Sequence, residues 1–138
     1  MSGLKIALAQ LNFTIGDFES NTAKMADVLF QAKQMADVLF QAKQDNVDLV
    51  VFSELAVCGY MPDDLLDYPS FVENCEHALE AVARACDGIA AIIGGVIRNP
   101  GKGRLLQNAA CFMYNGKIQH TIAKTLLPTY DVFNEHRY

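Results

Sequence analysis

Two charged residues follow directly on apolar segments that have the composition of buried strands. Glu54 comes after 47–53 (VDLVVFS), and Lys124 comes after 117–123 (KIQHTIA). In α/β proteins, ligand sites concentrate where strands end. Taken alone, each residue is explained more simply as the solvated end of a strand. Together, a carboxylate and an ammonium group suit acid–base chemistry on a substrate that becomes anionic during the reaction.

Aromatic residues accompany both charged positions. Tyr60 follows Glu54 in the segment SELAVCGY, and Tyr130 and Phe133 follow Lys124 in KTLLPTYDVF. They could be core residues or the wall of a pocket. If they are walls, a pocket with one carboxylate, one ammonium group and apolar sides would favour a neutral polar substrate whose carbonyl gains negative charge.

The elements that position these residues alternate between short aliphatic strands and longer helices. We expect strands at 5–11, 47–53, 89–98, 107–114 and 117–123, and helices at 17–44 and 69–86. Asp17 is the expected cap of the first helix, and Asn115-Gly116 predicts a tight hairpin turn. The order strand, helix, strand, helix, strand, hairpin indicates an α/β fold with helices packed on a mixed sheet.

A perfect tandem repeat lies within the first expected helix. Residues 25–34 and 35–44 both read MADVLFQAKQ. Ten residues advance a helix by about 1000°, so the two copies, about 15 Å apart along the axis, cannot bury the same face. Because little chain separates the second copy from the next strand, we expect 35–44 to dock and the first copy to extend outward. Phe30 should then be more exposed than Phe40.

Composition narrows the class of protein. The chain has 138 residues, a net charge of -5 and 51% hydrophobic residues, so we expect a single folded unit over 1–138. Its acidic balance argues against nucleic-acid or membrane partners. Four cysteines lack metal-ligand spacing, and neither a secretory signal nor a membrane-spanning run is present. We therefore expect free thiols, no metal and a cytoplasmic location.

Three longer segments carry a family resemblance: KIALAQLNFTIGDFESN, FSELAVCGYMPDDLL and KTLLPTYDVFNEHRY. Through them the chain resembles the carbon-nitrogen hydrolase (nitrilase) superfamily, and most strongly the N-terminal glutaminase domain of glutamine-dependent NAD synthetases. The resemblance covers every residue except one copy of the repeat. It implies that 1–138 is the N-terminal part of a nitrilase-like αββα sandwich whose first helix is lengthened by a tandem duplication.

The resemblance also implies roles for individual residues. Glu54 matches the family's general base, Lys124 the residue that stabilises the oxyanion, and Glu135 a second active-site glutamate. Tyr60 and Tyr130 match positions that line the substrate pocket. The implied reaction is attack of a cysteine thiolate on the glutamine side-chain amide, followed by hydrolysis of the resulting thioester.

The sequence departs from the family pattern at the nucleophile. The family's cysteine lies some tens of residues beyond the position of Lys124, whereas this sequence ends at Tyr138. The cysteines that are present are interpreted as small buried hydrophobic residues, at positions 58, 75, 86 and 111. We therefore expect the 138 residues alone to lack glutaminase activity.

The expected partners follow from the same resemblance. No glycine-rich phosphate loop is found, so ATP and deamido-NAD would belong to a C-terminal synthetase domain absent from this sequence, and no cofactor is expected for this domain. Glutamine is the implied substrate, and the full protein is expected to be a homo-oligomer. Two alternatives stay open: another amidase of the superfamily, such as an ω-amidase, or a non-catalytic chain engineered to study a duplicated helix.

Overall fold

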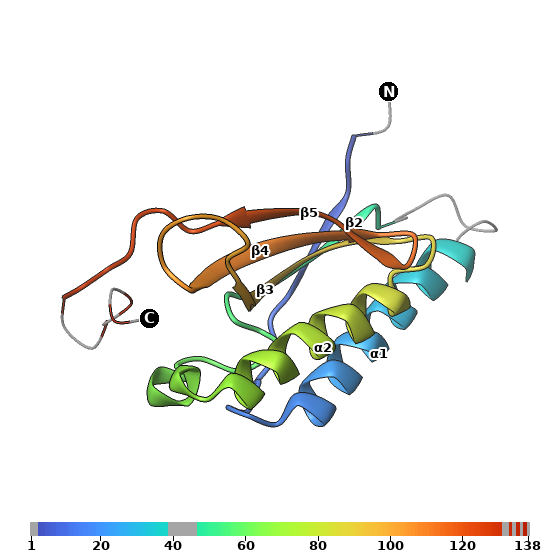
Figure 1. Ribbon diagram of the computed structural model, residues 1–138. Coiled ribbons are helices and arrows are strands. Elements are labelled where there is room, and N and C mark those ends of the chain that lie inside the picture. The colour runs from blue at the N-terminus through green and yellow to red at the C-terminus, as the bar shows by residue number, and fades with distance from the viewer. Residues whose placement is uncertain (1–2, 39–46, 131–132, 134, 136, 138) are drawn as a thin grey trace.

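A five-stranded mixed sheet carries two helices on one of its faces (Figure 1). The computed structural model describes residues 3–38, 47–130, 133, 135 and 137. The strands are β1 (Ile6–Ala9), β2 (Leu49–Phe52), β3 (Ala90–Arg98), β4 (Leu106–Tyr114) and β5 (Lys117–Ala123). The helices are α1 (Phe18–Val38), α2 (Pro69–Ala85) and the short 3-10 helix η1 (Asp63–Asp67). This arrangement confirms the α/β class and the mixed sheet.

The sheet follows the order of the chain, β1-β2-β3-β4-β5. The first three strands are parallel and are connected by α1 and α2, whereas β3, β4 and β5 are antiparallel neighbours. β5 therefore runs in the same direction as β2. As a result the carboxyl ends of β2 and β5 lie at the same edge of the sheet, where the two strand-end charges are expected.

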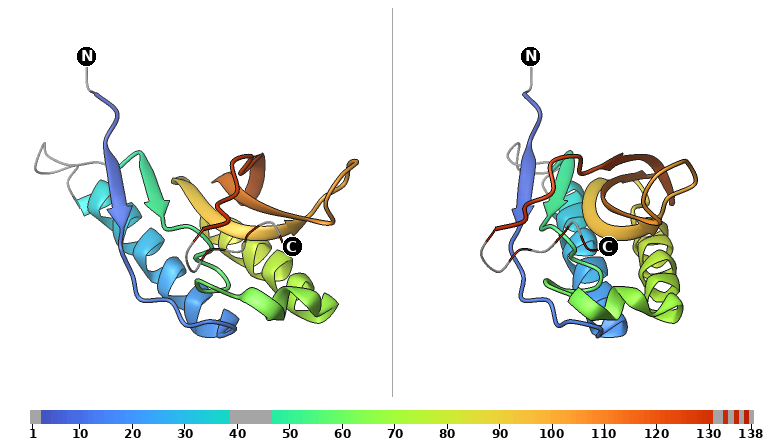
Figure 2. Two further views of the ribbon diagram at one scale, coloured as in Figure 1. Left: turned by 90° about the vertical axis from the view of Figure 1, so that its left-hand side faces the viewer. Right: turned by 60° about the vertical axis from the view of Figure 1, so that its left-hand side comes forward.

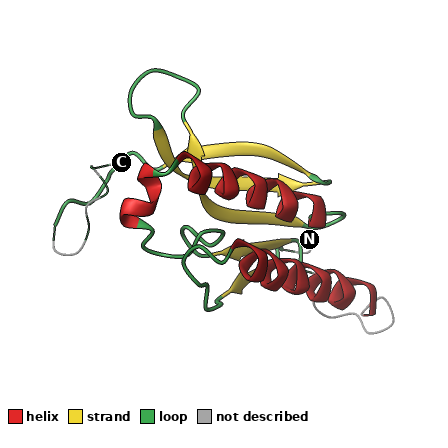
Figure 3. Cartoon of the chain, turned by 60° about the horizontal axis from the view of Figure 1, so that its bottom comes forward, coloured by secondary structure: helices red, strands yellow, loops and turns green. Residues whose placement is uncertain are grey.

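The two helices lie side by side and bury one face of the sheet (Figure 3). The predicted apolar stripe of α2 is confirmed, because Phe71, Cys75, Leu79 and Val82 are all buried. On the sheet, the side chains beneath the helices include Val50, Ile93, Cys111 and Met113. The opposite face is much more open, as the views in Figure 2 show; Leu8 and Ile122 on the outer strands are 79% and 74% exposed.

The start of α1 is fixed by two polar side chains. Asp17 caps the helix as predicted, since its Oδ1 accepts a hydrogen bond of 3.1 Å from the Ser20 backbone N–H. Asn21 is completely buried, and its Nδ2 donates to the carbonyls of Thr14 at 2.8 Å and Val57 at 3.2 Å. These bonds tie the first turn of α1 to the segment that follows β2.

The expectation that the first repeat copy extends outward is wrong. Met25, Leu29 and Ala32 of this copy are buried in the core. The reason is the anchored helix start: Met25 and Leu29 lie four and eight residues after buried Asn21 and therefore on its face of the helix. Phe30 on another face is 59% exposed, whereas Phe40 and the rest of 39–44 lie outside the described residues, so the lengthening of the helix is not shown.

The hairpin between β4 and β5 turns where the sequence predicts it. Asn115 and Gly116 both have left-handed φ angles, 51° and 76°, as a two-residue type I′ turn requires. Glycine and asparagine tolerate this conformation best among the common residues. None of the helices in the described part of the chain combines the length and the apolarity needed to cross a membrane.

Candidate active site

Glu54 reaches the site because the chain after β2 crosses the face of β3 at Gly94. A Cβ atom at Gly94 would lie 2.5 Å from the Leu55 backbone nitrogen and 2.8 Å from the Glu54 Cα. The neighbouring Gly95 faces Leu79 of α2, so Gly94 faces the side of the sheet away from the helices. The missing side chain at Gly94 thus allows residues 53–55 to lie directly on this side of β3.

Lys124 stands between two carboxylates. Its Nζ lies 2.9 Å from Glu54 Oε1 and 2.9 Å from Glu135 Oε1. The backbone N–H of Lys124 donates to the Asn108 carbonyl at 2.8 Å, which holds the residue at the end of β5. The backbone N–H of Glu135 donates to the Pro128 carbonyl at 3.3 Å, so the chain after β5 turns back toward Lys124.

The structure thus brings together Glu54, Lys124 and Glu135, although 70 positions separate the first two. Glu54 and Lys124 do not follow neighbouring strands, because β3 and β4 lie between β2 and β5. They meet because the segment after β2 crosses β3 at Gly94, and Asn108 on β4 occupies the remaining gap. Its Nδ2 donates a hydrogen bond of 2.6 Å to Glu54 Oε1.

The site favours the charged forms of its acid and its amine. Burial raises the pKa of Glu54, but hydrogen bonds from Lys124 and Asn108 and the charge of Lys124 outweigh it and hold that pKa below its ordinary value. Burial lowers the pKa of Lys124, but hydrogen bonds to Glu54 and Glu135 outweigh it and raise that pKa above its ordinary value. The Glu54 carboxylate and the Lys124 ammonium group are therefore both present at neutral pH.

Glu135 is the more enclosed of the two carboxylates. Its side chain is 17% exposed, and its Oε2 is buried without a hydrogen-bond partner among the described residues. The carboxyl groups of Glu54 and Glu135 share the one ammonium group of Lys124. Such a cluster can accept a proton while still presenting a cation to a developing oxyanion.

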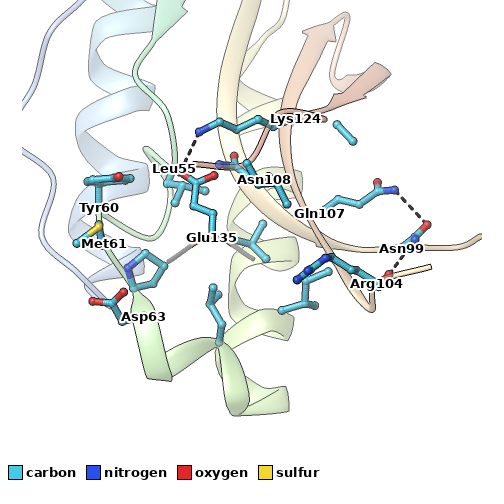
Figure 4. Close-up of a pocket in the computed structure, with 16 residues that line it drawn as sticks. Leu55, Tyr60, Met61, Asp63, Asn99, Arg104, Gln107, Asn108, Lys124 and Glu135 are labelled. Atoms are coloured by element: carbon cyan, nitrogen blue, oxygen red, sulfur yellow. Dashed lines mark hydrogen bonds and ion pairs between the residues drawn. The ribbon is translucent and has the colours of Figure 1, made fainter. Parts of the chain in front are cut away.

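Lys124 and Asn108 separate two hollows. A cavity of about 260 Å³ is lined by Lys124, Glu135, Tyr60 and residues of the β3–β4 loop (Figure 4). A second hollow of about 410 Å³ lies on the open face of the sheet and is lined by Glu54, Asn108 and Lys124. Lys124 therefore borders both spaces, with Glu135 lining the first and Glu54 lining the second.

The three aromatic residues form a connected group, but only Tyr60 lines the cavity. The Tyr60 and Phe133 rings are 6.5 Å apart between centroids, and Phe133 and Tyr130 are 5.6 Å apart in an edge-on arrangement. Tyr130 is 69% exposed. Burial and then the Glu135 and Glu54 carboxylates raise the pKa of Tyr60, so its hydroxyl stays protonated. Substrate contacts by these residues remain predictions.

The four cysteines of the sequence are all buried with free thiols. Burial raises the pKa of Cys86 and of Cys111 to about 11. A hydrogen bond with Cys58, followed by burial, also raises the pKa of Cys75. All four side chains have no exposed surface, so the interpretation of these residues as small buried hydrophobic side chains is confirmed. Over the described ranges, no cluster of three or more His, Cys, Asp or Glu residues could hold a metal ion.

Asn108 is the site residue that the sequence analysis missed. It lies in β4 opposite Val96 of β3, in a segment we interpreted only as a strand. The available signal was a pair of carboxamides, Gln107 and Asn108, at the start of a strand that is mostly apolar after them, where a partly buried polar group needs a partner.

Comparison with known proteins identifies the family of this chain. The sequence profile of the family described as Carbon-nitrogen hydrolase matches residues 5–137. The chain belongs to this family. Among curated relatives, the glutamine-dependent NAD(+) synthetase of Xanthomonas campestris is 38% identical over 98% of the chain, and that of Synechocystis is 41% identical over 96%. This carbon-nitrogen hydrolase chain spans only about 22% and 23% of their respective lengths.

Solved structures of glutamine-dependent NAD(+) synthetases are also similar to this chain. A glutamine-dependent NAD(+) synthetase from Cytophaga hutchinsonii superimposes with a TM-score of 0.83 at 26% identity, over 99% of this chain and 21% of that one. The synthetase from Acinetobacter baumannii, in complex with ADP, gives 0.82 at 33% identity, over 98% and 23%. An amidase from Nesterenkonia sp. shares the fold at 22% identity, with a TM-score of 0.64 over 92% and 44%. The carbon-nitrogen hydrolase chain thus forms part of the nitrilase fold.

Proposed function

We propose that this chain carries the acid–base and oxyanion-stabilising half of a site that hydrolyses the side-chain amide of glutamine and supplies ammonia for NAD synthesis. The observation that carries the proposal is the position of Lys124 Nζ, 2.9 Å from Glu54 and 2.9 Å from Glu135. Similarity to several glutamine-dependent NAD(+) synthetases supports glutamine as the amide.

In this proposal the nucleophile is a cysteine outside the 138 residues, because the four cysteines here are buried thiols. Glu54 takes the proton of that thiol, and the sulfur attacks the amide carbon. Lys124 stabilises the negative charge that develops on the amide oxygen. The C–N bond then breaks as Glu54 returns the proton to nitrogen, releasing ammonia and leaving a thioester. Water hydrolyses the thioester to glutamate.

A chimera tests this function. The 138 residues would replace the matching part of the Synechocystis synthetase, which is 41% identical and would supply the remainder of the protein. NAD formation is then measured with glutamine and, separately, with ammonium as the nitrogen source. We expect synthesis from both, since ammonium bypasses amide hydrolysis. Synthesis from ammonium but not from glutamine would refute the proposal.

Lys124→Ala in this chimera should lower the glutamine-driven rate by a factor on the order of a hundred to a thousand, as loss of one oxyanion stabiliser does. The ammonium-driven rate is the internal control and should not change. Near-normal glutamine turnover in the variant would remove Lys124 from the mechanism.

A further inference from the structure

Asn108 contacts the base of the proposed site without being one of its charged groups. We propose that Asn108 is a positioning residue: it holds Oε1 of Glu54, so that Oε2 is the oxygen that takes the proton from the attacking thiol. The inference rests on the proposed function, because it assigns the proton to one atom of the same carboxylate.

The two oxygens of Glu54 have different surroundings. Oε1 accepts the 2.6 Å hydrogen bond from Asn108 Nδ2 and the 2.9 Å contact from Lys124 Nζ. Among the described residues, no donor is recorded for Oε2. An oxygen that already accepts two short hydrogen bonds is a poor proton acceptor, because protonation would sacrifice at least one of them. The geometry therefore leaves Oε2 for the incoming proton.

Asn108 is better suited than Lys124 to fix this orientation. Lys124 is a flexible four-carbon side chain, whereas Asn108 has a short side chain on a strand paired on both sides. Its backbone lies opposite Val96 of β3, and its carbonyl accepts the Lys124 N–H at 2.8 Å. One residue thus fixes both the Glu54 carboxylate and the Lys124 main chain. Being neutral, it orients the carboxylate without cancelling its charge.

The location of the three side chains agrees with this role. Glu54, Asn108 and Lys124 all line the hollow of about 410 Å³ on the open face of the sheet. A thiol that transfers its proton to Glu54 must come within hydrogen-bond reach of the carboxylate. Because Oε1 is occupied by Asn108 and Lys124, such a group would approach at Oε2.

The test combines a titration with a rate measurement on Asn108→Ala. In the 138-residue chain, carbon-13 NMR follows the Glu54 carboxyl, assigned with Glu54→Gln. We expect the Glu54 pKa to rise by about one unit, because a hydrogen bond to the ionised form is lost. In the Synechocystis chimera, the glutamine-driven kcat should fall about ten- to a hundredfold with little change in KM. The acid limb of its pH profile should move upward with the NMR value.

Two further variants keep the result decisive. Gln119→Ala removes a side-chain hydrogen bond of 2.9 Å to the Tyr114 carbonyl in the same hairpin, and should leave both readouts unchanged. Asn108→Asp keeps the size of the side chain but removes the donor, so it should lower the rate at least as much as Asn108→Ala. Circular dichroism establishes that each variant is folded.

An unchanged Glu54 pKa in folded Asn108→Ala or Asn108→Asp would overturn the positioning role, as would full glutamine-driven activity. Failure of the proposed function would give a different result from failure of the positioning role. In that case the unsubstituted chimera itself makes no NAD from glutamine, while the titration of the 138-residue chain still shows whether Asn108 holds the carboxylate of Glu54.

Discussion

On the face of the sheet that α1 and α2 cover, Ile93 and Met113 have no exposed surface, whereas Ile122 on the opposite face is 74% exposed. The covered face is built from aliphatic and thiol side chains that pack beneath the helices. The open face carries Gly94, over which the Glu54 segment passes. The two faces belong to one sheet, yet one supplies most of the packing and the other positions charged groups.

The difference between the faces has a physical reason. Placing ionised groups beneath two helices would remove their hydration without enough partners to replace it. On the open face Glu54 and Lys124 remain partly accessible and pair with each other. The strands are therefore held in place from the helical side, while the chemistry is arranged on the side where solvent and substrate can enter.

The largest difference expected between the two faces is in the stability lost when one side chain is truncated on each. Leu79→Ala on the buried face of α2 removes a side chain that packs against the covered face of the sheet, and should lower the free energy of unfolding by about 3 kcal/mol. Ile122→Ala on the open face should cost less than about 0.5 kcal/mol. Urea denaturation measures both, and equal losses would show that the two faces do not differ as described.

Gly94→Ala tests whether position 94 must lack a side chain where residues 53–55 cross the open face of β3. The added methyl group would meet the backbone of Leu55 and Glu54, so we expect a loss of stability of about 2 kcal/mol. The hydrogen bond from Asn108 to Glu54 should also be disrupted, which a chemical-shift change of the Asn108 side-chain amide reports. Gly3→Ala is the control, because nothing lies within 4 Å of its added methyl group.

The smallest expected effect is the change with pH in the stability that Glu54 contributes. The Glu54 pKa is lower in the folded chain than its ordinary value of 4.5, so its contribution to stability is present above pH 4.5. That contribution is lost as the pH falls below 4.5 toward the folded value. The stability difference between the native chain and Glu54→Gln should shrink by less than about 1 kcal/mol over this range, since the pair is partly exposed.

Urea titrations at several pH values from 3 to 7 measure this difference. The stability lost in Leu79→Ala serves as the reference, because no ionisable group is removed there and its loss should not depend on pH. A Glu54→Gln difference that stays constant through pH 4.5 would contradict the ion pair.

The local elements were predictable because their signals are short-range. Asp17 marks the start of α1, Asn115-Gly116 forms the left-handed turn, and the apolar stripe of α2 gives its buried face. The docking of the repeat was not predictable in the same way. Both copies have identical residues, and the first copy is placed on the buried face of α1 by the anchoring of Asn21 against the carbonyls of Thr14 and Val57.

By itself, the sequence determined the residue types of the site, the segments that carry them and the family to which the chain belongs. Only the tertiary structure decided how Glu54 and Lys124 meet across two intervening strands. The backbone passes over β3 because Gly94 has no side chain, and Asn108 bridges the remaining distance with a 2.6 Å hydrogen bond. Both effects depend on atoms brought together by the twist and pairing of strands, which no local pattern of residues specifies.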